Sequence, residues 1–260
     1  MLNKIKSLLR GSTDIYDDQI LYHKNGSVMY EGSVKGINFH GMGKYYDEEG
    51  VLRYEGQFAN GLPHGQGKCY IEDGSIYEGQ LSDGERSGQG KKVFADGSVY
   101  EGRFLKDEMD GKGVLTKPDG TVYKGVFLRN FLDGSGSPTS PNEVNYPNGD
   151  VYIGEFSKNI ETGHGKLIIA SGTYEGEVVR ALPHGKGHFI WDNGSSYYGD
   201  FSEGMMTGKG TITYPNGEKY IGDFKNGYKH GYGTYQDCNG TLHECEFSED
   251  ELVATLNEIS

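Results

Sequence analysis

Two groups of residues have types and spacing that suggest chemistry, and the first is a recurring Gly-x-Gly followed by lysine. Examples are Gly65-Gln-Gly67-Lys68 and Gly163-His-Gly165-Lys166, and glycine-rich loops of this kind can cradle phosphates. A phosphate-binding loop also needs a Gly-Lys-Ser/Thr sequence, or glycines that open a helix after a strand. The sequence contains no Gly-Lys-Ser/Thr, and no such glycine is expected to open a helix. We therefore expect no nucleotide site and no cofactor.

The second group is Cys238, His243 and Cys245, three residue types that bind zinc. Their spacing matches none of the paired zinc templates, and no fourth ligand is evident. We expect no metal site. Three scattered cysteines in the whole chain also argue against a disulfide framework and favour a reducing compartment.

The elements that carry these residues are repeats. A tyrosine followed two residues later by glycine occurs nine times, and a Gly-x-Gly pair begins eleven residues after each tyrosine. The repeat starts are Tyr30, Tyr54, Tyr77, Tyr100, Tyr123, Tyr152, Tyr174, Tyr197 and Tyr220. Their spacing is 22 to 24 residues, except for 29 between Tyr123 and Tyr152. A fixed period of this size indicates a repeat architecture. Histidines and glutamates recur with the same period, whereas catalytic residues are normally unique, so we expect no enzyme.

Each repeat predicts two strands. In Tyr54-Glu-Gly-Gln-Phe58, positions 0, 2 and 4 share one face of an extended strand, and positions 1 and 3 point to the other. Position 4 is apolar in all nine repeats, and position 1 is glutamate in five, which is typical of a half-buried strand. A second alternating run begins at Gly-x-Gly, and a dipeptide such as Asp73-Gly74 precedes the next tyrosine. These dipeptides favour tight hairpins, so we expect an antiparallel meander.

Glycine inside a strand marks close approach of another group. We expect a ring from a neighbouring strand to lie over the backbone at Gly56 or Gly65. Two strands per repeat predict a ribbon on the order of 85 Å long. Wide sheets twist and curl, so we expect it to be curved.

The tyrosine, Gly-x-Gly and Asp/Asn-Gly skeleton resembles the MORN repeat, over about residues 22–247. The resemblance implies an all-β, elongated, twisted and curved antiparallel hairpin array. It also implies a binding or assembly module, often near membranes or the cytoskeleton. In several relatives such a module precedes a lipid kinase or SET-type methyltransferase domain or a membrane anchor.

The chain divides into five expected parts. These are a basic lead-in at residues 1–21, a first repeat block at 22–136, a Ser/Pro insertion at 137–145, a second repeat block at 146–247 and a C-terminal capping helix at 248–260. The insertion is expected to form an exposed loop or bulged edge. It predicts either a kink between the two blocks or phosphorylation at Ser137, Thr139 or Ser140.

Both ends are expected to carry short helices. Residues 1–10 place leucine and isoleucine at helical spacing, with Lys4, Lys6 and Arg10 between them. This segment either covers the first strand as a cap or binds weakly to the lipids of an anionic membrane surface. At the other end, Ser248-Glu-Asp-Glu251 matches a capping box before an apolar stripe that includes Leu252 and Leu256. This end is either a cap or an acidic docking tail.

The net charge of the chain limits which classes of molecule it is expected to bind. The net charge of −13 argues against nucleic acid, because phosphate binding needs a basic surface. A basic protein surface or peptide fits better. The chain has no run of 18 apolar residues that would span a membrane, and no signal peptide is apparent. We expect a cytoplasmic location, with association to membrane or cytoskeleton as an option.

These features favour a non-enzymatic scaffold that binds an extended peptide or an amphipathic helix along its aromatic face. The alternatives are a membrane-tethering module, a regulatory subunit of a separate enzyme and a homodimer. The expected partner-binding residues are Tyr54, Phe58, Tyr77, Tyr100, Phe104, Tyr123, Phe127, Tyr152, Phe156, Tyr197, Phe201, Tyr220 and Phe224. Equally, these rings could simply form the core.

Overall fold

The computed structural model describes residues 14–137 and 139–259. All regular structure in these residues is β-strand, which confirms the prediction of an antiparallel hairpin array. The chain forms two compact units, residues 1–130 and 131–260, which are described separately.

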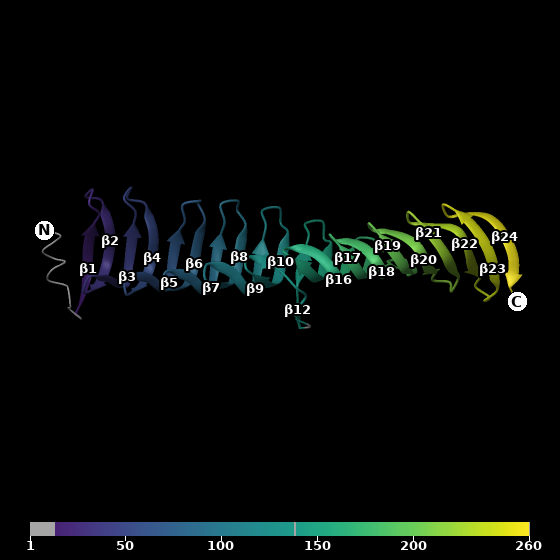
Figure 1. Cartoon of the computed structure of the whole chain (residues 1–260), viewed down its shortest axis with the longest axis horizontal. Coiled ribbons are helices and arrows are strands. Elements are labelled where there is room, and N and C mark those ends of the chain that lie inside the picture. Colours follow the sequence, from purple (N-terminus) through teal and green to yellow (C-terminus); the bar gives the residue numbers. More distant parts are fainter. Residues whose placement is uncertain (1–13, 138, 260) are drawn as a thin grey trace. The chain divides into compact units, whose positions relative to one another are not determined.

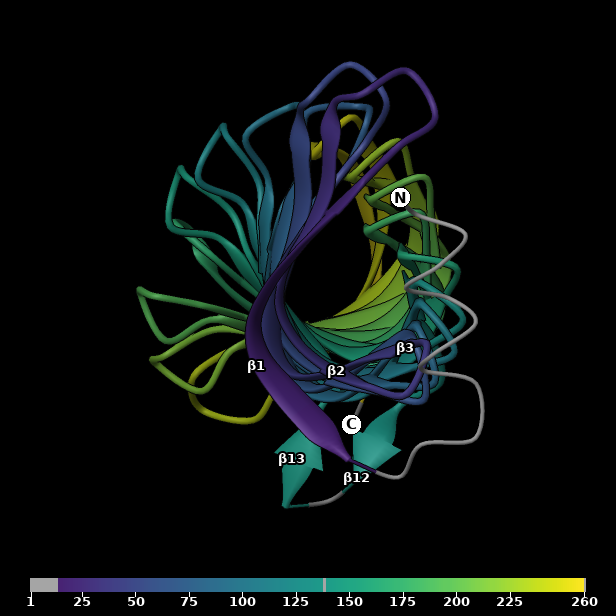
Figure 2. The same cartoon turned by 90° about the vertical axis from the view of Figure 1, so that its left-hand side faces the viewer.

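The first unit is a simple meander in which each strand pairs antiparallel with its sequence neighbours (Figure 1). Its strands are β1 (Ile15–Tyr22), β2 (Val28–Lys35), β3 (Asn38–Tyr46), β4 (Leu52–Ala59), β5 (Leu62–Tyr70), β6 (Ile76–Ser82), β7 (Glu85–Val93), β8 (Val99–Leu105), β9 (Glu108–Thr116) and β10 (Val122–Leu128). Figure 2 shows that the first of these strands bend along their length.

The second unit repeats this pattern from β14 to β24. Its strands are β11 (Phe131–Leu132), β12 (Gly136–Ser137), β13 (Ser140–Pro141), β14 (Glu143–Asn145), β15 (Val151–Ser157), β16 (Ile160–Ile169), β17 (Gly172–Val179), β18 (Leu182–Trp191), β19 (Ser196–Ser202), β20 (Met205–Thr213), β21 (Lys219–Lys225), β22 (Tyr228–Gln236), β23 (Leu242–Ser248) and β24 (Glu251–Ile259). The Ser/Pro insertion contains the separate two-stranded pairing of β12 with β13, which projects from the other strands (Figure 2).

Two kinds of turn alternate along both units. The Asp-Gly and Asn-Gly dipeptides that precede the next repeat tyrosine lie in longer loops. There only the glycine has positive φ, as at Gly74 (87°), and Asp73 accepts a hydrogen bond from the Ser75 amide (2.8 Å). The two-residue turns lie inside the repeats instead. Asn60-Gly61 has φ values of 51° and 86°, and Lys106-Asp107 has 49° and 69°. Positive φ at both central residues is the geometry that closes two-residue hairpins.

One local arrangement explains the tyrosines and glycines together. Gly56 and Gly67 face each other in register on β4 and β5, and the Tyr54 ring covers both. The register then shifts between Gly56 and Phe58, which leaves Gln57 in a bulge. The Tyr54 hydroxyl donates a hydrogen bond to the Gln57 carbonyl (2.7 Å). The bulge therefore gives the buried phenol its acceptor.

Neighbouring repeats join through perpendicular ring contacts. The ring of Tyr100 meets that of Phe104 in its own repeat at 5.2 Å and 88°, and that of Phe127 in the next repeat at 5.0 Å and 76°. Tyr197 makes the same two contacts with Phe201 (5.1 Å) and Phe224 (4.8 Å). Edge-to-face pairs at these distances are favourable beyond the area they bury.

The prediction of a ring from a neighbouring strand was wrong for both glycines: the tyrosine at Gly56 is Tyr54 of the same strand, β4, and no ring lies at Gly65. A side chain at Gly65 would meet the Gln57 amide oxygen rather than a ring, and Gly65 has a φ of 70°. Glycine is therefore favoured at position 65 because the backbone there has a conformation that other residues rarely adopt. The second glycine of the pair, such as Gly67, lies under the repeat tyrosine in eight of the nine repeats, and Gly136 is the exception.

The C-terminal capping helix predicted at residues 248–260 is also wrong. Glu251–Ile259 form β24, which pairs antiparallel with β23. Phe247 is position 4 of a degenerate last repeat, so Glu249-Asp250 falls where other repeats place their two-residue turn. Its φ values, 52° and 67°, match that turn. The repeat register therefore prevails over the local capping-box pattern. The N-terminal helix predicted at residues 1–10 lies outside the described residues.

Adding one methyl group at Gly67 tests the tyrosine–glycine contact. The Cβ of Gly67→Ala would overlap the Tyr54 ring, so we expect the free energy of unfolding in urea to fall by about 1–3 kcal/mol. Gly26→Asn is the matched control, because Gly26 has a φ of 92° with open space around it and asparagine tolerates that conformation. Equal stability of the two variants would contradict the arrangement described above.

Candidate functional site

The predicted partner-binding residues form the core. Twelve of the thirteen side chains are buried, and Tyr123 is half-buried. The buried ones are Tyr54, Phe58, Tyr77, Tyr100, Phe104, Phe127, Tyr152, Phe156, Tyr197, Phe201, Tyr220 and Phe224. Their role in partner binding stays a prediction. A partner docking on the surface would meet the neighbours of these rings before the rings themselves.

The hydroxyl groups of the core tyrosines donate hydrogen bonds within the protein. Tyr77 donates a hydrogen bond to the Gln80 carbonyl (2.7 Å), and Tyr174 donates one to the Glu177 carbonyl (2.6 Å). Burial raises the pKa of the Tyr77 and Tyr174 phenols to about 12. These phenols are structural groups that stay protonated at neutral pH.

The opposite face of the sheet carries the surface side chains. There, positions 1 and 14 of each repeat are cross-strand neighbours, as Glu55 and Lys68 are, and position 12 lies two residues before position 14. Positions 2 and 13, such as Gly56 and Gly67, point to the tyrosine face of the sheet, so no side chain lies between these rows. Each unit therefore has a groove that follows its glycine row.

The groove of the second unit is lined by exposed aromatic and aliphatic side chains. It encloses about 600 Å³, from Lys186 on β18 to Leu256 on β24. Tyr198 and Tyr232 are 62% and 61% exposed, and Ile221 between them is 51% exposed. A neighbouring hollow of about 510 Å³ shares Lys186 and Tyr198 and continues to β15. We call the groove from Lys186 to Leu256 the aromatic groove.

Two lysines at the aromatic groove are neutralised within the sheet. Lys186 pairs with Asp200 (2.6 Å), and Lys209 pairs with Asp223 (2.7 Å). The hydrogen bond from Lys186 lowers the pKa of the Asp200 carboxyl. The groove therefore offers rings and aliphatic groups beside paired charges.

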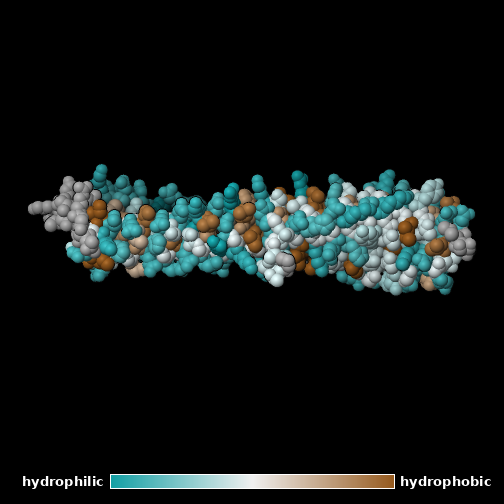
Figure 3. All heavy atoms as spheres, turned by 60° about the horizontal axis from the view of Figure 1, so that its bottom comes forward, coloured by the Kyte–Doolittle hydropathy of each residue, from teal (hydrophilic) through white to brown (hydrophobic). Residues whose placement is uncertain are grey.

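Exposed apolar residues also occur outside the aromatic groove, for example Ile15, Tyr16, Ile20 and Tyr22 on β1. Figure 3 shows one face on which hydrophobic residues form separate spots among hydrophilic ones. Single exposed apolar residues are normal on soluble proteins, whereas a lined groove is a better candidate for binding.

Sequence reasoning missed Tyr198, Ile221 and Tyr232. The available signal was the set of four exceptions at position 1, where five repeats carry glutamate and the others carry Lys124, Ile153, Tyr198 and Ile221. Tyr232 stands at position 12. A tyrosine on a strand otherwise predicted to be wet on that side indicates an exposed ring. The groove itself needed the structure, because it depends on which glycines face each other.

The cysteines and the possible metal ligands form no reactive site in the part of the chain that the structure describes. Among residues 14–137 and 139–259, no group of three or more His, Cys, Asp or Glu side chains is placed to hold a metal ion. Cys238 is exposed and Cys245 is buried, with its thiol 3.6 Å from the His243 carbonyl. Burial raises the pKa of the Cys69 thiol to about 11. A thiol with that pKa is a poor nucleophile at neutral pH.

The predicted lipid-binding residues Lys4, Lys6 and Arg10 lie outside the described residues. No helix in the part of the chain that the structure describes is long and apolar enough to cross a membrane.

A family comparison agrees with the repeat geometry. The MORN repeat model matches residues 30–51, 54–76, 77–99, 100–122, 152–173, 174–196, 197–219 and 220–242. The chain belongs to the MORN repeat family. The repeat at Tyr123, which precedes the Ser/Pro insertion, is left unmatched. No curated protein matches this MORN repeat chain.

Several solved structures show a limited likeness to this MORN repeat chain. The wild-type TCP10 domain of Danio rerio CPAP is 11% identical, with 92% of this chain and 99% of that chain covered and a TM-score of 0.43. The SAS-4 TCP domain of Drosophila melanogaster, in complex with a proline-rich motif of Ana2, is 13% identical, with 80% and 90% covered and a TM-score of 0.32. Both TM-scores are below 0.5, so neither fold nor partner is inferred from these structures.

The buried phenols predict alkaline unfolding. Burial raises the folded-state pKa of Tyr30, Tyr77, Tyr174 and Tyr220 from 10.0 to about 12. Folding thus favours the protonated phenols. Their stabilisation is complete below pH 10 and is lost as the pH rises towards 12. We expect circular dichroism and phenolate absorbance to change together in this window, reversibly on return to pH 9. Phenolate formation throughout the chain near pH 10 with unchanged circular dichroism would contradict this assignment.

Proposed function

We propose that the chain is a non-enzymatic scaffold that holds a segment of a partner protein in the aromatic groove. The observation that carries the proposal is the exposure of Tyr198, Ile221 and Tyr232 along one lined groove. Tyrosine is among the residues that contribute most to protein interfaces, because it offers a large apolar face with one polar end.

The sheet restricts how a partner can bind there. Strands β19 to β22 each pair with a strand on both sides, so their backbone groups are already hydrogen-bonded. A partner in the groove would therefore bind side chains rather than add a strand. With Lys186 and Lys209 in ion pairs, Glu244, which accepts a hydrogen bond from the Asn257 amide, is the further charged residue that lines the groove.

Regulation of a separate enzyme, membrane tethering, self-association and a cytoplasmic location remain sequence-based proposals. Each is compatible with a scaffold that binds protein segments.

The proposal predicts that two exposed rings dominate binding. Segments would be selected from a displayed peptide library on the full chain, and their affinities compared with those for a Tyr198→Ser/Tyr232→Ser variant. We expect about a tenfold loss or more, because central interface tyrosines often contribute over 1 kcal/mol each. Tyr16→Ser/Tyr22→Ser is the matched control, since these tyrosines of β1 are also exposed (40% and 41%). Failure to select any segment, or equal losses in both variants, would refute the assignment.

A further inference from the structure

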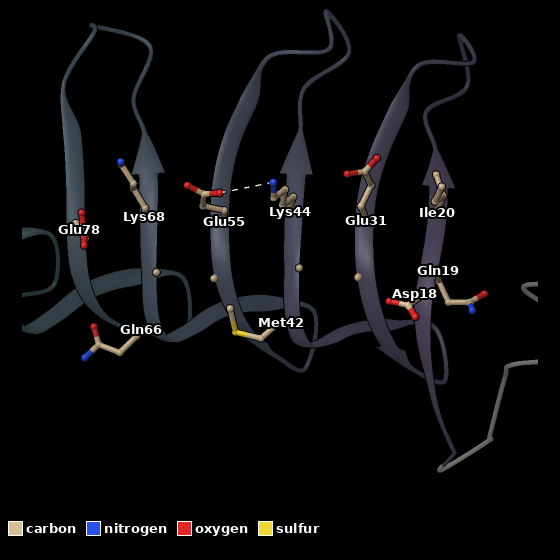
Figure 4. A pocket seen from close by; sticks show the side chains of 14 residues that line it. Asp18, Gln19, Ile20, Glu31, Met42, Lys44, Glu55, Gln66, Lys68 and Glu78 are labelled. Carbon is tan, nitrogen blue, oxygen red and sulfur yellow. Dashed lines mark ion pairs between the residues drawn. The ribbon is translucent and has the colours of Figure 1, made fainter.

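A second groove, in the first unit, differs from the aromatic groove in its chemistry. It encloses about 840 Å³ across β1 to β6. Its floor follows Gly32, Gly43, Gly56 and Gly67, which face one another in register on successive strands. Figure 4 shows glutamates and lysines on one side of this glycine row, with Met42 and Gln66 on the other. We call it the charged groove.

Charges of opposite sign alternate along one side of the charged groove. Cross-strand register places its members in the order Ile20, Glu31, Lys44, Glu55, Lys68 and Glu78. With Asp18, the lining includes four carboxylates against two lysines. The groove therefore has an excess of negative charge that complements a basic ligand.

Hydrogen bonds within the sheet hold the first two glutamates in place. The Tyr46 hydroxyl donates to Glu31 (3.0 Å), and the Tyr70 hydroxyl donates to Glu55 (2.7 Å). Lys44 lies 3.9 Å from Glu55, which is the limit of an ion pair. The carboxylates are thus positioned while their charge is only partly compensated.

The groove has the width of an extended chain. Its two sides come from residues two apart on one strand, such as Met42 and Lys44, which are about 7 Å apart along the strand. An α-helix with its side chains is about 10–12 Å wide. Strands β2 to β6 below the groove are paired on both sides, so a ligand over them must leave its own backbone to water. Polyproline II has no internal backbone hydrogen bonds and a fully solvated backbone, so it meets this condition.

The spacing of the glutamates matches the same conformation. Glu31, Glu55 and Glu78 lie on alternate strands β2, β4 and β6, so successive glutamates are separated by about 9.6 Å. In polyproline II, every third residue falls on the same face, about 9.3 Å further along. Over two intervals the two spacings differ by less than about 1 Å.

We propose that the charged groove binds a partner segment in the polyproline II conformation with lysine or arginine at every third position. Each basic side chain pairs with one of Glu31, Glu55 and Glu78. Lys44 and Lys68 stand between the glutamates and repel additional basic residues, so the groove selects spacing as well as charge. Met42, which is 64% exposed, and Ile20, which is 51% exposed, contact the apolar residues of the segment.

The first test varies only the ligand. Fluorescence anisotropy on the full chain, at low ionic strength, would compare a peptide of repeated Arg-Pro-Ala triplets with a peptide of the same composition in which the arginines are contiguous. We expect the spaced peptide to bind about tenfold more tightly, with an affinity that falls as salt is added. Equal affinities would overturn the proposal, because general attraction to an acidic chain would then explain binding.

The second test varies the groove. Glu31→Gln, Glu55→Gln and Glu78→Gln together are expected to weaken the spaced peptide about tenfold. The matched control is Glu49→Gln, Glu72→Gln and Glu85→Gln, which removes the same charge from exposed positions of the same unit outside the groove. An equal loss in the control would overturn the proposal. If the groove variant fails to fold by circular dichroism, the ligand comparison on the unchanged chain still decides.

The charged groove does not depend on the aromatic groove. The Tyr198→Ser/Tyr232→Ser variant is expected to bind the spaced peptide as tightly as the unchanged chain. A loss there would place the peptide in the aromatic groove and overturn the assignment to the first unit.

Discussion

The structure depends on one contact, a tyrosine ring that lies over two facing glycines. Tyr54 covers Gly56 and Gly67 in this way, and its hydroxyl reaches the carbonyl that the Gln57 bulge releases from the ladder. Any other residue at Gly67 would place a Cβ inside the ring. The ring, the glycine pair and the bulge therefore depend on one another. Their repetition along the chain gives each unit a core that is one layer of rings thick. On the other face, strand alternation places no side chain at the level of this glycine pair, and the grooves follow that row.

One face of the sheet forms the core and the other carries the surface side chains, so repeats with the same fold can differ in their surface chemistry. The fold requires positions 0, 2, 4 and 13, which carry the rings and the facing glycines. Positions 1, 12 and 14 lie beside the groove and carry no core contact that the fold needs, so they can change from repeat to repeat. Position 1 is Glu55 in the first unit and Tyr198 in the second, on strands with equivalent pairing. Binding specificity is thus carried by positions that the fold leaves unconstrained.

The sequence predicted what is repeated and missed what depends on register. The period, the strand alternation and the all-β class could be predicted because the same pattern recurs nine times, and each copy supports the interpretation of the others. The capping helix at residues 248–260 failed because a local capping-box match was weighed without the register, which places Glu249-Asp250 at a two-residue turn. Turns such as Arg180-Ala181 carry no turn-forming residues at all and are imposed by the strands around them. The exposed side of Tyr198 could have been predicted from its position in the repeat, whereas the groove depends on cross-strand register, which spacing along the chain does not state.

Alternating charge in the charged groove follows from the repeat itself. Position 1 comes from the tyrosine strand and position 14 from the glycine strand, so the two types always alternate across the sheet. Like charges directly opposite one another destabilise a sheet, so a glutamate at every position 1 needs a neutral or basic residue at position 14. At Tyr198 and Ile221, which carry no carboxylate, the following position 14 residues are Thr211 and Thr234. Ile153 is followed by Lys166, which is the cross-strand neighbour of Glu175 on its other side. The lysines therefore accompany the glutamates, and the distance between glutamates is fixed at two strand separations. A ligand that binds those glutamates therefore needs basic side chains at the spacing of alternate strands in the sheet.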